Sequence, residues 1–336
     1  MNKLVVKLKQ HTPLLHFQHS QEGATLRASE VKPKLDKFIL TKLGEGNYED
    51  GIERARDNGW LVGKGEHPAL NYKMRIEVDG KFDISMPQNV LMDRRRNIPK
   101  CNEYGNQLYT TPNYPDNNNS LIMGNMGGRV EEELLNFTMY KDVTIFFTFI
   151  NKVSDKDEVS KLKEQIESDC VQFFGENNFG NRTSKGFGSF TVNKIDDKTI
   201  KTDKIERDWE LEYVLYPKGN DRIRNKSVYK DIFTIVNQIW RYFKRNSRER
   251  IVEKRVFLGV QNRLTGNEER IPSPLMFKPI ISMNRDEVTV EMLMFLQSDV
   301  IESAKADIDD FYELIDELLE EFTIEGYNLI HDIEVI

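Results

Sequence analysis

The stretch Phe179-Gly180-Asn181-Arg182-Thr183-Ser184-Lys185-Gly186-Phe187-Gly188-Ser189-Phe190 lies between two segments with different hydrophobic periods. Before it, residues 158–174 repeat apolar side chains at helical spacing, and after it the apolar residues through Val192 alternate as in a strand. A nucleotide-binding P-loop runs from strand to helix and needs the pattern GxxxxGK(S/T), which this stretch lacks. The order of a helix, a glycine-rich loop at 175–190 and a strand therefore predicts an α+β fold without a P-loop.

The segments before this stretch continue the alternation of strands and helices. The expected elements are strands at 2–10, 72–78, 81–85 and 142–150 and a helix from Ser29, its expected N-cap, to Leu43. Asp79-Gly80 is a hairpin turn signal, so the two middle strands of this half are either paired as this hairpin or separated by the insertion that follows. Residues 87–128 are rich in proline, asparagine and glycine, which predicts an irregular insertion.

The segments after it repeat the same order. The expected elements are strands at 209–216, 256–260, 277–282, 288–296 and 327–336 and helices at 228–243 and 308–322. Two successive βαββαβ units predict tandem ferredoxin-like, RRM-like domains with antiparallel sheets. The expected domains are residues 1–200, with the insertion at about 87–128 and the glycine-rich loop at 175–190, and residues 201–336, with an acidic C-terminal helix.

The charge is distributed unevenly along the 336 residues. Residues 299–336 hold thirteen acidic side chains against one lysine, so the rest of the chain carries +5 although the total is −7. A mildly basic body is compatible with binding phosphate groups, and a solvated acidic helix face accounts equally for the C-terminal segment. Two cysteines without a CxxC pair, no apolar run of membrane-spanning length and no signal peptide pattern lead us to expect a cytoplasmic protein.

The glycine-rich loop allows two interpretations. Glycines at 175, 180, 186 and 188 permit positive φ, so successive amides could form an anion-binding nest to which Arg182 and Lys185 add charge. Alternatively, the loop is a turn whose Phe187 and Phe190 simply re-enter the core. The residues alone favour neither interpretation.

Two further segments carry side chains suited to chemistry. His11, His16 and His19 are close in sequence, but no carboxylate or cysteine lies at a recognisable ligand spacing, so we expect no metal or other cofactor. The segment from Leu26 to Lys32 places an arginine at the start of a helix, which is a favourable position for phosphate and also an ordinary capping arrangement.

Three motifs, in order, resemble those of the RAMP superfamily of CRISPR-associated proteins, most closely the first subunit of the type III-B Cmr effector module. They are Thr12-Pro13 with Leu26-Arg27-Ala28-Ser29-Glu30-Val31-Lys32, the glycine-rich loop from Phe179 to Ser189, and Phe257-Leu258-Gly259 with Arg270-Ile271-Pro272-Ser273-Pro274-Leu275. Where this pattern normally continues with glycine after Lys32, this chain has Pro33. The family fold of paired ferredoxin-like domains agrees with the periodicity.

The resemblance implies a non-catalytic subunit of a type III CRISPR ribonucleoprotein in antiviral defence, with guide or target RNA and other effector subunits as partners and no membrane. The residues expected to contact RNA are Arg27, Lys32, Lys34, Arg182, Lys185, Gly186, Gly188, Ser189 and Arg270. Two alternatives stay open: a metal-independent endoribonuclease that processes guide RNA through one of the histidines, and a protein-only scaffold that docks a neighbour through its acidic helix.

Overall fold

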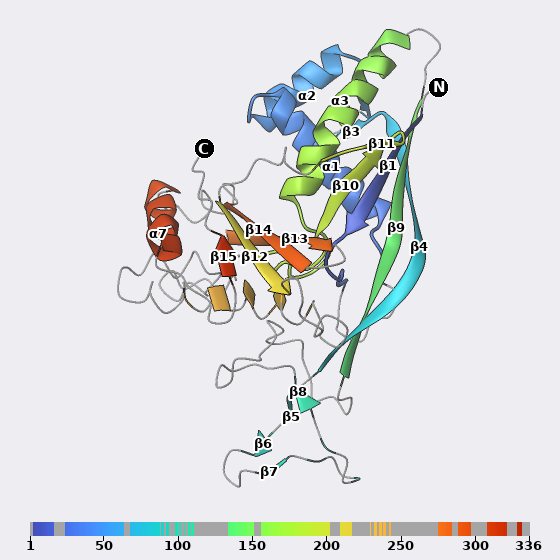
Figure 1. The fold of residues 1–336 in the computed structure, drawn as a ribbon. Helices are drawn as coiled ribbons and strands as arrows, with labels where there is room; N and C mark the ends of the chain where they lie inside the picture. Colours follow the sequence, from blue (N-terminus) through green and yellow to red (C-terminus); the bar gives the residue numbers. More distant parts are fainter. Residues whose placement is uncertain are drawn as a thin grey trace.

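A computed structural model describes residues 3–16, 24–63, 68–87, 134–150, 156–201, 209–216, 275–283, 288–296, 308–320 and 328–330, with individual positions between 89 and 110 and between 229 and 242. These residues form an α+β structure with antiparallel sheets, which confirms this part of the expected fold (Figure 1). None of the described helices is long and apolar enough to cross a membrane.

The larger sheet has five antiparallel strands, and helices lie on one of its faces (Figure 1). Its order is β11 (Lys198–Thr199), β10 (Phe190–Ile195), β1 (Lys3–Gln10), β9 (Leu134–Phe149) and β4 (Tyr72–Pro87). Helices α1 (Ala28–Leu43) and α3 (Lys156–Glu176) bury the core between themselves and this sheet. The first unit thus has the predicted order of strand, helix, strand, strand, helix and strand.

Strand β1 shows how the sequence pattern assigns the two faces of the sheet. Leu4, Val6 and Leu8 are buried in the core, whereas Lys3 and Lys7 are exposed on the other side. Successive residues of a strand point to opposite faces, so the lysine alternation that predicted this strand also identifies the face that the helices leave uncovered.

The hairpin at Asp79-Gly80 does not form, and the insertion separates the two middle strands, β4 and β9, as the alternative expected. Strand β4 continues through these residues and pairs with β9 along its whole length, with Asp79 opposite Asp142 and Lys81 opposite Tyr140. Gly80 stays in the strand with φ of +66°, and its amide donates to the Asp79 carboxylate at 2.7 Å. Because β9 is sixteen residues long, its ladder outweighs the local turn preference.

Two helix starts also differ from expectation. Helix α1 begins at Ala28 with Arg27 as its N-cap, earlier in the chain than the expected Ser29 cap, and no side chain caps it. Helix α2 (Tyr48–Asp57) was not among the expected elements. The side chain of Asn47 caps α2 by accepting from the amides of Glu49 and Asp50, at 3.0 and 3.4 Å.

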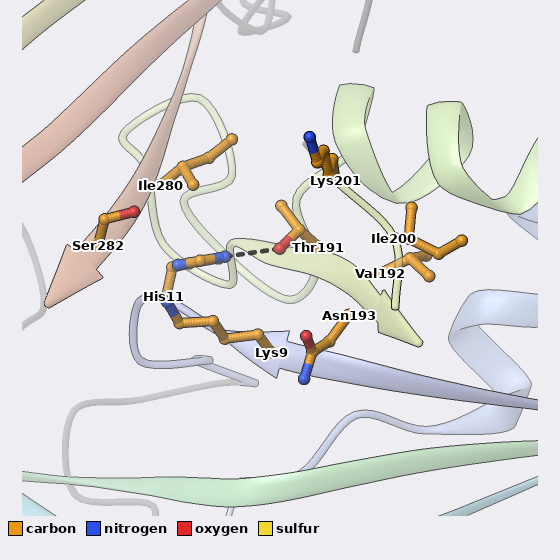
Figure 2. A pocket seen from close by; sticks show the side chains of 9 residues that line it. All are labelled: Lys9, His11, Thr191, Val192, Asn193, Ile200, Lys201, Ile280 and Ser282. Carbon is orange, nitrogen blue, oxygen red and sulfur yellow. Dashed lines mark hydrogen bonds between the residues drawn. The ribbon is translucent and has the colours of Figure 1, made fainter. Parts of the chain in front are cut away.

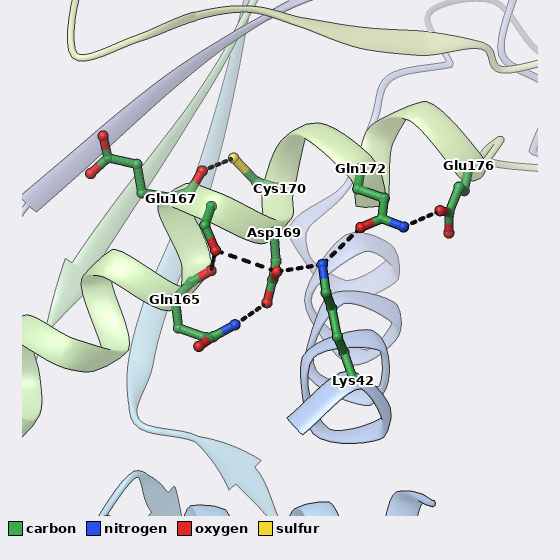
Figure 3. A network of polar contacts seen from close by, with 8 residues as sticks. Lys42, Gln165, Glu167, Asp169, Cys170, Gln172 and Glu176 are labelled. Atoms are coloured by element: carbon green, nitrogen blue, oxygen red, sulfur yellow. Dashed lines mark hydrogen bonds and ion pairs between the residues drawn. The ribbon is translucent and has the colours of Figure 1, made fainter. Parts of the chain in front are cut away.

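A polar network joins the end of α1 to α3 (Figure 3). The Lys42 ammonium lies 3.0 Å from the buried Asp169 carboxylate and donates to Gln172 at 2.7 Å. Gln165 donates to the other oxygen of Asp169 at 2.5 Å. A buried carboxylate requires such partners, so this network fixes the two helices relative to each other.

The smaller sheet draws its strands from the second half of the chain. Its order is β13 (Leu275–Met283), β14 (Val288–Leu296), β12 (Trp209–Tyr216) and β15 (Asn328–Ile330), all antiparallel. The described positions between Tyr229 and Tyr242 are helical, and α7 (Ile308–Glu320) is the last helix. Most of the expected elements of this half are therefore present.

The remaining described strands are short, and several predicted segments lie outside the described residues. The short strands are β2 (Leu61–Val62), β3 (Ala69–Leu70), β5 (Asn89–Val90), β6 (Met92–Asp93), β7 (Ile98–Pro99) and β8 (Tyr109–Thr110). The last four lie in the expected insertion at 87–128. The expected strand at 256–260 and most of the final strand at 327–336 lie outside the described residues.

Candidate functional site

The glycine-rich loop between α3 and β10 depends on glycine at three positions. Gly180, Gly186 and Gly188 have φ of +79°, +81° and +69°, a region that other residues rarely adopt. A Cβ on Gly188 would lie 1.9 Å from the carbonyl oxygen of Phe179. The prediction that these glycines permit positive φ is confirmed for the three, whereas Gly175 lies in the last turn of α3 and does not shape the loop.

The segment that follows β1 is bound directly to this loop. The Thr12 hydroxyl donates to the carbonyl of Gly186 at 2.6 Å and accepts from the amide of Ser189 at 2.9 Å. The amide of Gly188 donates to the carbonyl of Pro13 at 2.8 Å. Two of the three sequence motifs, far apart along the chain, therefore form one unit.

Strand β13 of the smaller sheet contacts the loop from the other side. Asn178 donates through its side-chain amide to the carbonyl of Phe277 at 2.8 Å, and the Ser189 hydroxyl donates to the carbonyl of Pro279 at 2.7 Å. A Cβ on Gly186 would meet the ring of Pro279 at 2.9 Å. The loop is thus the junction between the two sheets, a role that the sequence did not indicate.

Lys278 is the residue of this junction that sequence reasoning missed. Its side chain is fully buried, and its ammonium donates to the carbonyls of Asn177 and Phe190 at 2.9 and 3.0 Å and approaches the Asn178 side-chain oxygen at 3.4 Å. Burial, which disfavours the charged form, lowers its pKa to about 7. A lysine within an otherwise apolar strand was the available signal.

The anion-nest interpretation of the loop loses most of its backbone donors. The amides of residues 179–181, 185, 186, 188 and 189 all donate to acceptors within the protein. One acceptor is a carboxylate, because Gly180 donates to Glu30 in the first turn of α1 at 2.6 Å. These seven amide donors are therefore already occupied by the chain's own groups.

The loop phenylalanines re-enter the core, as the second interpretation of the loop expected. The ring of Phe187 stacks on that of Phe233 from the second half, with centroids 4.1 Å apart and planes at 15°. Phe179 and Phe190 contact each other within the core of the first half. The junction is therefore apolar as well as hydrogen bonded.

Four of the predicted RNA contacts are exposed or half-buried, two at the start of α1 and two in the loop. Arg27 is exposed at the N-cap, and Lys34 is exposed one turn into the helix. The Lys34 ammonium lies 3.3 Å from the Glu30 carboxylate and 5.2 Å from the ring centre of the loop residue Phe179. Arg182 and Lys185 are half-buried in the loop itself. These side chains remain candidates for binding phosphate.

The other predicted contacts are held inside the protein or lie outside the described residues. Lys32 donates to the buried Asp36 carboxylate at 2.6 Å and lies over the ring of Tyr72 at 3.9 Å. Ser189 is fully buried, and Gly186 and Gly188 are buried against backbone or proline atoms. Ser189, Gly186 and Gly188 support the junction, whereas the half-buried Lys32 is held by partners within the first half of the chain. Arg270 lies outside the described residues.

His11 lies at the edge of a cleft of about 400 Å³ between the two sheets, with Lys9, Lys201 and Asn193 among the lining residues (Figure 2). Its Nδ1 accepts from the amide of Ile281 at 2.9 Å, so the proton lies on Nε2, which contacts the Thr191 hydroxyl at 2.7 Å. Both ring nitrogens are therefore occupied, as expected of a structural histidine. His16 contacts the carbonyl of Thr25 at 2.6 Å, and His19 lies outside the described residues.

We expect His11 to make the protein less stable in mild acid. Burial, followed by the charges of Lys9 and Lys278, lowers the pKa of His11 well below its usual value. The unfolded chain therefore binds a proton that the native imidazole refuses, so stability is lost as pH falls through about 6.5. His11→Gln should flatten the fall in the urea midpoint between about pH 7 and about pH 5. If the urea midpoint fell equally with pH in the wild-type protein and in His11→Gln, the role of His11 in this pH dependence would be contradicted.

Comparison with known proteins places the chain in a family. The model of the Cmr1 N-terminal domain matches residues 1–246. No curated protein matches the chain. A chain from a cryo-EM structure of the type III-B Cmr-beta complex with cognate target RNA, AMPPnP and ssDNA is 14% identical, with 94% of this chain and 98% of that chain covered and a TM-score of 0.48.

The crystal structure of apo Cmr1 from Pyrococcus furiosus is 12% identical, with 88% of each chain covered and a TM-score of 0.39. The family match extends over more than half of the sequence and includes two of the three motifs that carried the resemblance to the first Cmr subunit. That resemblance is confirmed. The chain belongs to the Cmr1 family, defined by its N-terminal domain.

Proposed function

We propose that this chain is a non-catalytic, RNA-binding subunit of a type III-B CRISPR ribonucleoprotein that acts in the cytoplasm. The observation that carries the proposal is the Cmr1 family match over residues 1–246. The partners we propose are guide or target RNA and the other subunits of the effector complex. The cations around the start of α1 support this proposal, since phosphate contacts supply much of the affinity for nucleic acid.

We also infer that both halves are ferredoxin-like domains. The strands of the first unit lie in the order β10, β1, β9 and β4, and those of the second in the order β15, β12, β14 and β13. In both, the fourth strand along the unit lies beside the first, then the third and the second. This shared order supports the tandem arrangement that the periodicity predicted, divided near residue 200.

The RNA contact that we propose is made by side chains at the contact between the loop and α1. Most loop amides already donate to acceptors within the protein, so the groups that bind phosphate are side chains. These are Arg27, Lys34, Arg182 and Lys185. The Glu30 carboxylate accepts from the Gly180 amide and lies 3.3 Å from the Lys34 ammonium, which reduces its repulsion of a phosphate. The glycines hold these groups in place and do not contact RNA.

Replacing Arg182 and Lys185 together by glutamate should weaken binding of single-stranded RNA by at least about tenfold. The slope of log K against log salt should also become shallower, by about 0.7 for each phosphate that the variant no longer neutralises. Fluorescence anisotropy with a labelled oligoribonucleotide over a salt series measures both quantities.

The matched control carries the same charge change at two exposed helix positions, Lys37→Glu with Lys161→Glu. It should leave the salt slope of the wild-type protein nearly unchanged. Equal affinity and equal slope for the loop variant and this control would refute the loop contact. Cleavage of RNA by the purified wild-type chain, with or without added metal, would refute the non-catalytic role.

A further inference from the structure

The five-stranded sheet has a second face that the helices do not cover. Its central positions are Lys3, Val5 and Lys7 of β1, Thr144, Phe146 and Thr148 of β9, and Lys73, Arg75 and Glu77 of β4. Cross-strand partners in an antiparallel ladder point to the same face, so the register places these nine side chains together. We refer to them as the open sheet face.

The exposure of these residues shows that this face is accessible. Lys3, Lys73 and Thr148 are exposed, and the Arg75 side chain is 68% exposed. The neighbouring residues of β9, Ile145 and Phe147, are fully buried on the helix side. The two faces of one strand therefore have opposite characters, and the open one faces solvent.

An aromatic ring stands at the centre of the open sheet face. Phe146 is half-buried and lies directly opposite Val5 on one side and Arg75 on the other. The Arg75 guanidinium lies over its ring, 4.7 Å from the centroid. An aromatic side chain on a solvent-facing sheet gains little for the core, whereas it offers a surface on which a nucleic acid base can stack.

Cations surround this ring. Lys3 and Lys73 face each other across Thr148, and Lys7 is opposite Thr144, so each lies diagonally from Phe146. Glu77 is the one acidic member of the nine, and its carboxylate lies 2.7 Å from the Arg75 guanidinium. Lys194 of β10 adds a further cation opposite Lys7.

The positive face continues to the cleft between the two sheets. Lys9 is the next residue of β1 on the same face, and its ammonium donates to the carbonyl of Ile281 in β13 at 2.6 Å. The cleft of about 400 Å³ lies beside it, lined also by the exposed Lys201 (Figure 2). Basic groups thus extend across the sheet to this boundary.

We propose that the open sheet face is a second RNA-binding surface, on which a single strand stacks one base on Phe146 and places its phosphates against the surrounding lysines. This inference rests on the proposed RNA-binding function. A sheet with a central aromatic residue is a common platform for single-stranded RNA. An acidic protein segment would use the lysines but would gain little from the ring, so the combination favours RNA.

The test separates stacking from charge in the full-length protein with a fluorescein-labelled oligouridylate. Phe146→Ala should weaken binding by roughly 5- to 150-fold, which corresponds to the loss of one stacked base, and should leave the salt slope unchanged. Phe146→Tyr should retain the affinity because it keeps the ring. Lys73→Gln should lower the salt slope by about 0.7.

Lys198→Gln is the matched control, since Lys198 pairs with Ile195 and therefore points to the helix side of the same sheet. If wild-type protein binds RNA and Phe146→Ala binds as well as Phe146→Tyr, the open sheet face is refuted while the proposed function stands. If wild-type protein binds no RNA, both fail. If Phe146→Ala lost binding to another effector subunit while its RNA affinity stayed unchanged, this face would be a protein interface and the inference would be overturned.

Discussion

Gly188→Ala should lower the free energy of unfolding of the first half of the chain by about 3–4 kcal/mol. A Cβ at this position would lie 1.9 Å from the carbonyl oxygen of Phe179 and 3.0 Å from its amide nitrogen. Both are backbone atoms of the same loop, which Thr12 and Pro13 hold in place by hydrogen bonds. The loop cannot relax without giving up these bonds, so the steric cost adds to the backbone strain.

Gly59→Ala is the control that isolates the steric contribution. Gly59 has φ of +68°, against +69° for Gly188, so an alanine suffers the same backbone strain at both sites. Near Gly59, however, the added Cβ meets only the carboxylate end of Glu158, a flexible side chain that can move aside. The control should therefore cost only about 1 kcal/mol.

Native-state hydrogen exchange of the β1 and β10 amides measures these free energies, because these strands flank the loop. This measurement is preferable to a single unfolding curve, since the two halves need not unfold together. If both alanine variants lost the same free energy of unfolding, the close approach of residue 188 to Phe179 would not constrain the loop.

The sequence predicted elements well where one segment determines its own structure. The lysine and apolar alternation of β1 and the spacing of α3 and α7 carry their periods within single segments, and the structure reproduces them. The failure at Asp79-Gly80 has a different physical cause, which is strand pairing over a long sequence distance. Asp79-Gly80 has the composition of a turn, and neither strand alone indicates that β4 pairs with β9 along its full length.

Some features of the candidate site likewise follow from local sequence, and others depend on tertiary contacts. The positive φ values of the loop glycines follow from local composition, and the union of the loop with Thr12 agrees with the motif resemblance. The third partner of the loop, β13, could not be found from spacing, because tertiary contacts alone bring Phe277 and Pro279 against it. The same contacts turned Ser189 from an expected RNA contact into a buried hydrogen-bond donor.

Lys278 is expected to make the protein more stable as pH rises from about 7 to about 9, by about 2 kcal/mol relative to Lys278→Met. The native pKa of about 7 lies below the ordinary lysine value of 10.5, because the ammonium is buried against neutral oxygens. Between these two values the unfolded chain holds a proton that the native chain releases. Stability therefore increases with pH in this window, and the penalty of burying the charge is largest below pH 7.

Lys278→Met removes both the buried charge and the donor to the carbonyls of Asn177 and Phe190. At pH 7 these two changes have opposite effects on the free energy of unfolding. Deleting the buried charge stabilises the protein, whereas leaving the buried carbonyls unpaired costs about 1–3 kcal/mol. Near pH 9 the native amine is already neutral, so only the cost of the unpaired carbonyls remains and the variant becomes still less stable than wild type.

Urea unfolding followed by tryptophan fluorescence, under reducing conditions because Cys101 is exposed, measures the difference in stability. Replacing the exposed Lys161 by methionine should leave the pH dependence unchanged, and a Lys278→Met curve parallel to wild type would show that Lys278 keeps its proton in the native state.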